Sequence, residues 1–301
     1  VDANGDISGG PMYYIEQGLG KKWKPLAVLF SIFGVMTACL GSGTYTQANA
    51  IMSSIEVTFG VQPIITDAVL TILVAVIILG GLQSIAKAAE KIVPGMAVLY
   101  IVSVVALLVV YADRVPDAVA LIIHDAFNPT AAVGGFLGAT VMTTIRSGIA
   151  RGIFSNESGL GSAPIVAAAA KTKWPAEQGL ISMTGTFIDT IIICTMTGLA
   201  VVASGLWTGD LNGASLTNGA FAQAFPSFGN YLVTICLALF AFTTILGWNY
   251  YGERCMIYLA GTKAILPYRI VFILLIASAA FLKLEVIWTL ADIVNGLMAI
   301  P

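Results

Sequence analysis

One stretch of the sequence, Ser147 to Gly161, places polar side chains and several glycines between two apolar segments. Within it, Ser155, Asn156 and Ser158 supply side-chain oxygens. Where a membrane helix is interrupted, the ends of its two halves and the freed carbonyl groups can coordinate a small solute or an ion near the middle of the bilayer. The stretch is therefore a candidate binding site. The plainer alternative is a long helix that runs into an interfacial loop.

Thr243 and Thr244 place two adjacent hydroxyls inside another apolar segment, and Gly247, Trp248 and Tyr251 continue their face at helical spacing. Adjacent hydroxyl oxygens are hard ligands that suit a small cation. The alternative is that each hydroxyl bonds to the carbonyl one turn earlier in its own helix, as membrane threonines often do.

Ionisable residues are rare in the apolar segments, and Asp189 is the main example. A carboxylate within a membrane span is a functional hypothesis by default. The structural alternative is an ion pair with Arg146 or Arg151, which also need compensation inside the protein. Asp292 is taken as the only other acid deep in a span. His124 is interpreted as an interfacial loop residue.

A face of small and polar residues is predicted in the segment 25–54, which we expect to form one helix. Small residues on a membrane helix let a neighbouring helix approach closely, and packing is the favoured interpretation. For Gln47, an amide in the middle of the span, a functional role is equally supported. The face comprises Thr37, Gly41, Thr44 and Ala48, with Gly43 and Gln47 beside them.

The composition excludes most soluble functions. Of the 301 residues, 58% are hydrophobic and 10% charged, whereas a soluble domain has about 25% charged residues. A net charge of −2 provides no basic surface for nucleic acid. Nucleotide-binding and common hydrolase motifs are absent from the sequence, so a nucleotide partner is not expected.

The apolar runs are continuous and long enough to cross a bilayer core as helices, which favours an all-α integral membrane protein over a barrel. Region 131–170 is predicted as one further crossing that contains a break, with half-helices from Thr130 to about Ile149 and from Pro164 to Ala170. The seven unbroken predicted spans are 25–54, 64–83, 92–112, 178–206, 228–250, 266–282 and 286–300.

The basic residues predict the orientation, because short loops rich in Lys and Arg tend to stay in the cytoplasm. They fall in alternate loops, so eight crossings would put both ends of this chain on the cytoplasmic side. The residues assigned to cytoplasmic loops are Lys21, Lys22, Lys24, Lys87, Lys91, Lys171, Lys173, Arg254, Lys263 and Arg269.

Three motifs resemble the alanine or glycine:cation symporter family. They are residues 10–15 (GPMYYI) with Gly18 and Gly20, residues 154–164 (FSNESGLGSAP) and residues 247–253 (GWNYYGE). The resemblance implies a leucine-transporter-like fold of two inverted five-helix repeats. It makes 1–301 one transmembrane domain: a cytoplasmic lead-in (1–24), helices three to five (25–112) and helices six to ten (130–301). On this view the chain begins after the second helix of a longer protein.

The same resemblance assigns site residues. It implies that half of the site belongs to a broken first helix that this chain lacks, with the rest supplied from the third, sixth and eighth helices. The implied substrate-binding residues are Gly43, Thr44, Gln47, Ile153, Phe154 and Trp248, and the implied Na⁺ ligands are Asn156, Thr243 and Thr244.

The function that the resemblance implies is Na⁺-coupled symport by alternating access, with no enzyme activity. The implied substrates are L-alanine and glycine, with D-alanine and coupling to H⁺ left open. The implied location is the prokaryotic plasma membrane, crossed several times. A gated ion channel is the first alternative, and a membrane-embedded enzyme built on Asp189 is the second.

Overall fold

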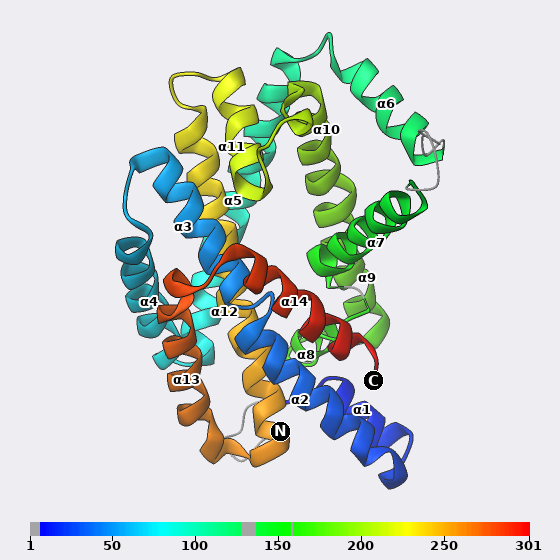
Figure 1. The fold of residues 1–301 in the computed structure, drawn as a ribbon. Helices are drawn as coiled ribbons and strands as arrows, with labels where there is room; N and C mark the ends of the chain where they lie inside the picture. Colours follow the sequence, from blue (N-terminus) through cyan, green and yellow to red (C-terminus); the bar gives the residue numbers. More distant parts are fainter. Residues whose placement is uncertain (1–6, 128–136, 158) are drawn as a thin grey trace.

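The computed structural model describes residues 7–127, 137–157 and 159–301, and these form helices and turns without a strand (Figure 1). In chain order the helices are α1 (Pro11–Gly18), α2 (Lys24–Leu40), α3 (Tyr45–Phe59), α4 (Pro63–Leu79), α5 (Leu82–Val110), α6 (Val115–Phe127), α7 (Leu137–Asn156), α8 (Ala163–Ala167), α9 (Pro175–Thr186), α10 (Thr195–Ser204), α11 (Gly213–Ala224), α12 (Gly229–Ala260), α13 (Ile265–Ala277) and α14 (Leu284–Ala299).

The prediction of an all-helical membrane protein is confirmed. Within the described ranges, five helical stretches are long and apolar enough to cross a membrane, and α4 is a shorter apolar helix. The eight-crossing topology stays a prediction, and residues 128–136 at the start of the broken crossing lie outside the described residues. The five stretches are Lys21–Phe59, Gln83–Val110, Pro175–Ser204, Gly229–Ala260 and Thr262–Phe281.

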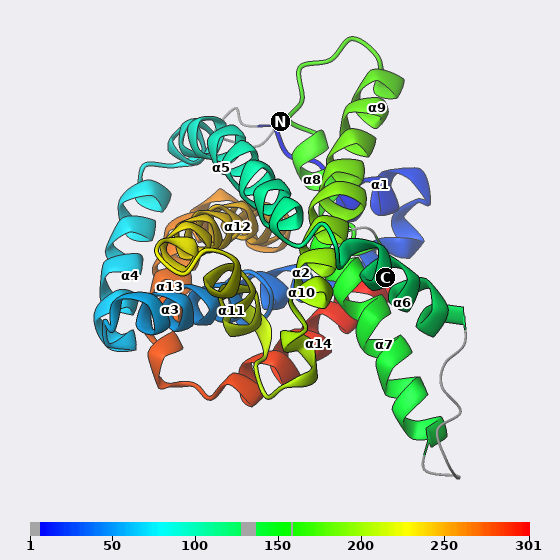
Figure 2. The same ribbon diagram turned by 90° about the horizontal axis from the view of Figure 1, so that it is seen from above.

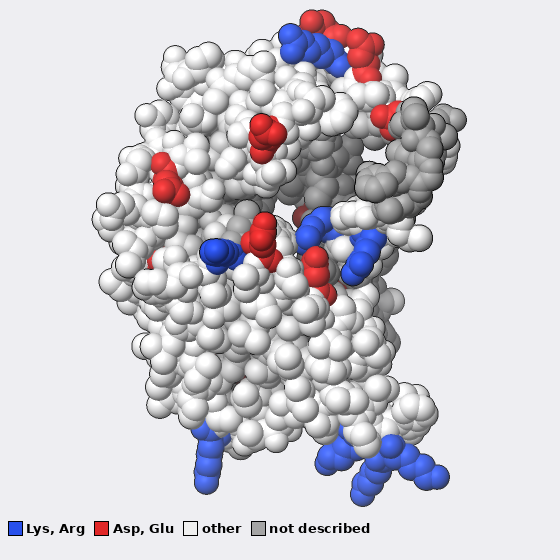
Figure 3. Space-filling model, in the orientation of Figure 1, with Lys and Arg blue, Asp and Glu red and all other residues white. Residues whose placement is uncertain are grey.

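Helix α12 forms the centre of the packing and contacts α2, α3, α5, α11 and α13 (Figure 2). The outer helices turn large apolar side chains outward: Val76 of α4, Val109 of α5 and Leu274 of α13 are 68%, 69% and 63% exposed. Apolar surface on this scale fits contact with lipid. Lys and Arg side chains project from the end that carries α1 and the turn between α12 and α13 (Figure 3).

The prediction of one continuous helix over 25–54 is wrong at one point. Helix α2 ends at Leu40 and α3 begins at Tyr45, with an irregular turn over 41–44 between them. Gly41 and Thr44 therefore do not share the face of a single helix with Ala48. The spacing of these residues is also compatible with one continuous helix, and so it predicted one. In the structure, side chains instead bond to the backbone carbonyls that the turn leaves free.

The predicted break in 131–170 is confirmed, with different boundaries. Helix α7 continues to Asn156, well past the predicted end near Ile149, and α8 covers only Ala163–Ala167. The glycines at 148 and 152 are tolerated within α7, and the regular backbone ends where Glu157 takes a positive φ of 57°. Ser158, in the middle of the break, lies outside the described residues.

The predicted span 178–206 is one helical run with a change of winding. A π-helical stretch, η2 (Phe187–Cys194), separates α9 from α10 and contains Asp189. Such stretches are rare and frequently mark functional sites.

Five basic residues assigned to loops lie in α-helices instead. Lys24 begins α2, Lys87 and Lys91 lie in the first three turns of α5, and Arg269 lies in α13. Arg254 belongs to α12, which runs ten residues beyond the predicted end at 250. Arg254 is buried because Glu253 accepts its hydrogen bond at 3.3 Å and also binds Arg269 at 2.7 Å. An ion pair of this kind lets a helix carry charge into the interior.

His124 was expected in a loop and is instead an exposed residue of α6. Its Nδ1 lies 3.0 Å from an oxygen of Asp125.

Candidate functional site

A cavity of about 340 Å³ lies where the two helix interruptions meet α12, η2 and α14. Ten residues line it, with hydroxyl, amide, carboxylate, guanidinium and aromatic groups together. Figure 3 shows a hollow, with acidic and basic side chains at its edge, on the face that carries α7 and α14. The lining residues are Ser42, Thr46, Gln47, Arg151, Ser155, Glu157, Asp189, Thr244, Trp248 and Trp288.

The first interruption is held by side chains that bond to its own backbone. The Thr44 hydroxyl donates to the carbonyl of Cys39. The Gln47 amide and the Thr46 hydroxyl both donate to the carbonyl of Ser42, at 3.1 and 3.2 Å. These bonds satisfy carbonyls that a helix would otherwise use, which is a requirement for irregular backbone inside a membrane protein.

Helix α14 packs tightly against this first interruption. The Thr37 hydroxyl donates to the carbonyl of Val294 at 3.0 Å, and the Asn295 amide donates to the Ser42 hydroxyl at 2.6 Å. A Cβ on Gly41 would lie 2.6 Å from a methyl of Val294, so a side chain there would push α14 away. At Gly41 the expected close approach of a neighbouring helix is confirmed.

The second interruption contains a glutamate and a glycine in left-handed backbone conformations. Glu157 accepts a hydrogen bond from Ser162 at 2.7 Å, and Tyr251 of α12 hydrogen-bonds the same carboxylate. Gly161 has a φ of 77°, and a Cβ there would lie 2.8 Å from the Phe30 ring. Only glycine meets both the backbone and the packing demand at this position.

Asp189 faces the second interruption from η2. Its Oδ2 accepts hydrogen bonds from the Ser155 hydroxyl at 2.7 Å and the Thr190 hydroxyl at 3.4 Å. Within the described part of the chain, no Lys or Arg lies at ion-pair distance from Asp189. The structural alternative of an Asp189 ion pair with Arg146 or Arg151 is therefore wrong for this structure.

Arg151 is paired with α14. Its guanidinium lies 3.3 Å from an oxygen of Asp292 and stacks over the Trp288 ring, 4.1 Å from the ring centre. The contact joins α7 to α14 across the edge of the cavity. Both charges are partly exposed, so we expect the pair to position α7 against α14 and to add little to stability.

Helix α12 supplies the aromatic wall. Trp248 is 2% exposed, and a Cβ on Gly43 would lie 2.6 Å from its Cβ. Thr244 lines the cavity, and its hydroxyl donates to the carbonyl of Phe240, one turn earlier in its own helix, at 2.9 Å. The Thr243 hydroxyl donates to its own helix and lies 3.7 Å from the sulfur of Met96 on α5. The two adjacent hydroxyls thus face different neighbours.

Of the residues predicted for the site, the structure brings Gln47, Thr244 and Trp248 together around the cavity. Gly43 lies behind Trp248, and Thr44 is fully buried beside it.

Asn156 and Ile153 are not among the residues that line this cavity. The Asn156 amide donates to the Thr190 hydroxyl at 3.1 Å. Ile153 lines a second cavity between α7 and α14, together with Asp292. The side chain of Phe154 lies outside the described residues.

Sequence reasoning missed Ser42, Thr46 and Trp288 in the lining. The Ser42–Gly43 dipeptide is a turn signal that favours an interruption at this point. Trp288 precedes Asp292 by four residues and so shares its helix face.

Asp67 was also missed, and Asp292 is not the only other acid in a span. Asp67 is 2% exposed on α4 and accepts a hydrogen bond from the Ala280 amide at 3.3 Å. It fixes the turn η5 (Ala279–Phe281) between α13 and α14.

Comparison with known proteins identifies the family. A family model described as the sodium:alanine symporter family matches residues 1–301. An uncharacterized transporter of Haemophilus influenzae is 56% identical over all of this chain and 66% of its own length. The sodium/alanine symporter AgcS of Methanococcus maripaludis is 48% identical, again over all of this chain and 66% of its own length.

A probable sodium/glutamine symporter of Bacillus subtilis, GlnT, is 38% identical over 99% of this chain and 61% of its own length. The chain thus spans slightly less than two thirds of these relatives. All three are named as transporters or symporters. The match over its full length places this chain in the sodium:alanine symporter family.

Proposed function

We propose that the protein containing this chain carries a small neutral amino acid together with Na⁺ across the plasma membrane of a prokaryote. Family membership and the 340 Å³ polar cavity support this proposal. The observation that carries it is that two helix interruptions from distant parts of the chain line one cavity. Transporters bind substrates and coupling ions at such interruptions.

The cavity suits a zwitterion in charge and size. Carboxylates of Glu157 and Asp189 and the guanidinium of Arg151 line the same space, so both ends of an amino acid meet an opposite charge. Its volume is at the low end of the range of about 300–1,000 Å³ typical of small-molecule sites. Alanine and glycine fit that space, and bulkier side chains meet Trp248. L-alanine and glycine are the proposed substrates, with D-alanine to be tested beside them.

Each residue group has a proposed role. Trp248 limits the side chain of the substrate, and Gln47 offers an amide to its polar end. The predicted substrate set is Gly43, Thr44, Gln47, Ile153, Phe154 and Trp248, of which Gln47 and Trp248 line the cavity and carry the proposal. The proposed Na⁺ set is Asn156, Thr243 and Thr244, of which Thr244 faces the cavity.

Coupling requires that Na⁺ favour the conformation that binds the amino acid. We propose that one helix bundle rocks against the other around the cavity, and that the two interruptions accommodate the change in helix direction. The α14 contacts to Ser42 and Thr37 would link the first interruption to this motion.

The test is uptake of radiolabelled alanine by the full-length protein in liposomes. Inward gradients of Na⁺, K⁺ and H⁺ are compared, with empty liposomes as the control. Accumulation driven by the Na⁺ gradient alone supports the proposal. Accumulation driven by the H⁺ gradient alone would mean that H⁺ is the coupling ion. Glycine, D-alanine and glutamine are tested as competitors, because a relative is named for glutamine. Saturation by alanine separates a carrier from a channel.

A further inference from the structure

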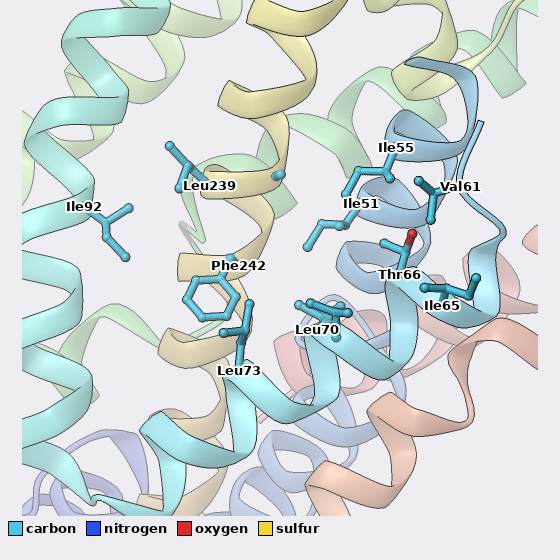
Figure 4. Close-up of a pocket in the computed structure, with 12 residues that line it drawn as sticks. Ile51, Ile55, Val61, Ile65, Thr66, Leu70, Leu73, Ile92, Leu239 and Phe242 are labelled. Carbon is cyan, nitrogen blue, oxygen red and sulfur yellow. The ribbon is translucent and has the colours of Figure 1, made fainter. Parts of the chain in front are cut away.

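A third cavity, of about 420 Å³, lies on the opposite side of α12 from the polar site and is almost entirely apolar. Figure 4 shows side chains from α3, α4, α5 and α12 pointing into one space. Its lining residues are Ile51, Ile55, Val61, Ile65, Thr66, Val69, Leu70, Leu73, Ile92, Ala238, Leu239 and Phe242. We call this the α4 groove.

The α4 groove opens toward lipid. Ile65, Val69 and Leu73 line it and are each more than half exposed, whereas Leu70 is buried at its floor. These rim residues belong to the apolar face that α4 turns outward, so the groove is continuous with the lipid-facing surface. An apolar cavity excludes water, and acyl chains are the apolar material available on this side.

One polar group enters this space, the hydroxyl of Thr66. The residue is 6% exposed, and its Oγ1 has no hydrogen-bond partner among the described residues. Figure 4 shows this oxygen at the end of the groove near Val61. A buried hydroxyl in an apolar setting is unfavourable unless it finds an acceptor. The occupant is therefore expected to be apolar with one acceptor at this end.

The depth of Thr66 identifies that acceptor. Gly60 and Gln62 are exposed in the turn between α3 and α4, and Glu56 is exposed one turn earlier. Exposed irregular backbone does not lie in the hydrocarbon core, so this turn lies at the headgroup level. Thr66 follows three residues after the start of α4 at Pro63, or about 4.5 Å deeper. Ester carbonyls of phospholipids lie at this boundary.

The other end of the groove lies near mid-membrane. Ile92 is ten residues into α5, and Phe242 is thirteen residues into α12 from the opposite end. At 1.5 Å per residue these positions are about 15 and 20 Å along their helices. The groove therefore runs from the interface toward the middle of the bilayer, which is the path of an acyl chain.

We propose that the α4 groove binds one acyl chain of a bilayer phospholipid, with the Thr66 hydroxyl donating to its ester carbonyl. The site is separate from the polar cavity, and it does not depend on the proposed transport function.

The test uses the full-length protein in liposomes that contain a phosphatidylcholine with a diazirine midway along one acyl chain. After photolysis, mass spectrometry measures adducts at Leu70 and Phe242 relative to Val76. Val76 is exposed on α4 outside the groove and reports ordinary lipid contact. We expect adducts at Leu70 and Phe242, and Thr66→Val should lower the ratio about two- to tenfold, as the loss of one hydrogen bond would.

Matched variants isolate the hydroxyl. Thr71→Val removes another buried, unpartnered hydroxyl of α4 that does not line the groove, and it should leave the ratio unchanged. Thr66→Ser keeps the hydroxyl and should retain labelling. An ether-linked probe, which lacks the carbonyl, should label wild type as weakly as the ester probe labels Thr66→Val. Ala238→Leu should block the groove and reduce labelling without touching Thr66.

Two results would overturn the proposal. Labelling of Val76 without adducts in the groove would mean that another segment of the full-length protein fills it. Equal labelling of wild type and Thr66→Val, or equal losses in Thr66→Val and Thr71→Val, would remove the hydroxyl from lipid recognition.

Discussion

The two helix interruptions differ in what holds them. The turn over 41–44 is closed by hydrogen bonds to its own carbonyls and is packed between α14 and Trp248, with no charged side chain in it. The break after α7 has a glutamate in a left-handed conformation and faces the carboxylate of Asp189. The first interruption provides a rigid wall, and the second provides charge. Substitutions that affect packing should therefore damage the first most, and substitutions that remove charge the second.

The largest effect is expected from Gly43→Val. A Cβ at this position meets the Trp248 Cβ and the Ala38 carbonyl, both at 2.6 Å, so the turn or α12 must move. Overpacking of this kind costs about 1–3 kcal/mol or more. We expect a clear fall in unfolding temperature and loss of alanine uptake in the full-length protein.

Gly247→Ala is the matched control, because a Cβ there would meet nothing within 4 Å beyond its chain neighbours and the backbone of its own helix. It should retain stability, since alanine is favoured over glycine within a helix by about 0.5–1 kcal/mol. Normal stability of Gly43→Val would contradict the view that the first interruption is a packed wall.

Asp189→Asn tests the charged interruption. It keeps the shape of the side chain and removes the charge that accepts hydrogen bonds from Ser155 and Thr190. Charged hydrogen bonds contribute about 1.5–3 kcal/mol, so uptake should fall about 10- to 100-fold with little change in unfolding temperature. Asp210→Asn, in an exposed turn, should leave uptake within about twofold of wild type. An equal loss in both variants would argue against a special role for the cavity carboxylate.

Thr244→Ala is expected to have a smaller effect, on ion dependence. Loss of one hydroxyl ligand should raise the Na⁺ concentration for half-maximal uptake about two- to tenfold. Thr243→Ala is the matched comparison and should shift it less, because that hydroxyl faces Met96. The alanine concentration for half-maximal uptake at saturating Na⁺ should change little in Thr244→Ala. An equal rise in the Na⁺ and the alanine concentrations for half-maximal uptake would count against an ion-site role for Thr244.

The smallest expected effect is a change of specificity in Trp248→Phe. A smaller ring enlarges the cavity, so valine should compete with the uptake of labelled alanine about fivefold better than in wild type. The estimate follows because a methylene group contributes about 1 kcal/mol in a pocket. A larger truncation at this position, such as Trp248→Ala, should admit larger substrates at a cost in stability. Trp174→Phe, at a position 71% exposed, is the control. An unchanged profile in Trp248→Phe would remove Trp248 from the wall.

The sequence predicted the second interruption and missed the first for one physical reason. The polar, glycine-rich stretch around Asn156 differs in composition from the helices on either side. The residues of the first turn, Gly41 and Thr44, also fit a helical face. The Ser42–Gly43 dipeptide is the local signal against a helix, and contacts from α14 and Trp248 hold the turn. Spacing alone does not separate these outcomes.

Buried charge was the other limit of prediction. Arg254 was assigned to a loop because it follows the predicted end of its span at 250, whereas α12 continues to Ala260 and Glu253 compensates the buried charge. Asp67 was overlooked because it lies one turn inside the predicted span, next to the turn that it stabilises. The Ala280 amide that binds Asp67 and the Arg269 guanidinium that binds Glu253 come next to these residues only in the folded chain.

The central claim is that the cavity between the two interruptions holds the transported amino acid. The most direct measurement is an electron cryomicroscopy structure of the full-length protein with alanine and Na⁺ bound. We predict density for alanine in contact with Gln47 and Trp248, and density for Na⁺ beside Thr244. Alanine bound instead in the neighbouring cavity between α7 and α14, away from these residues, would contradict the account.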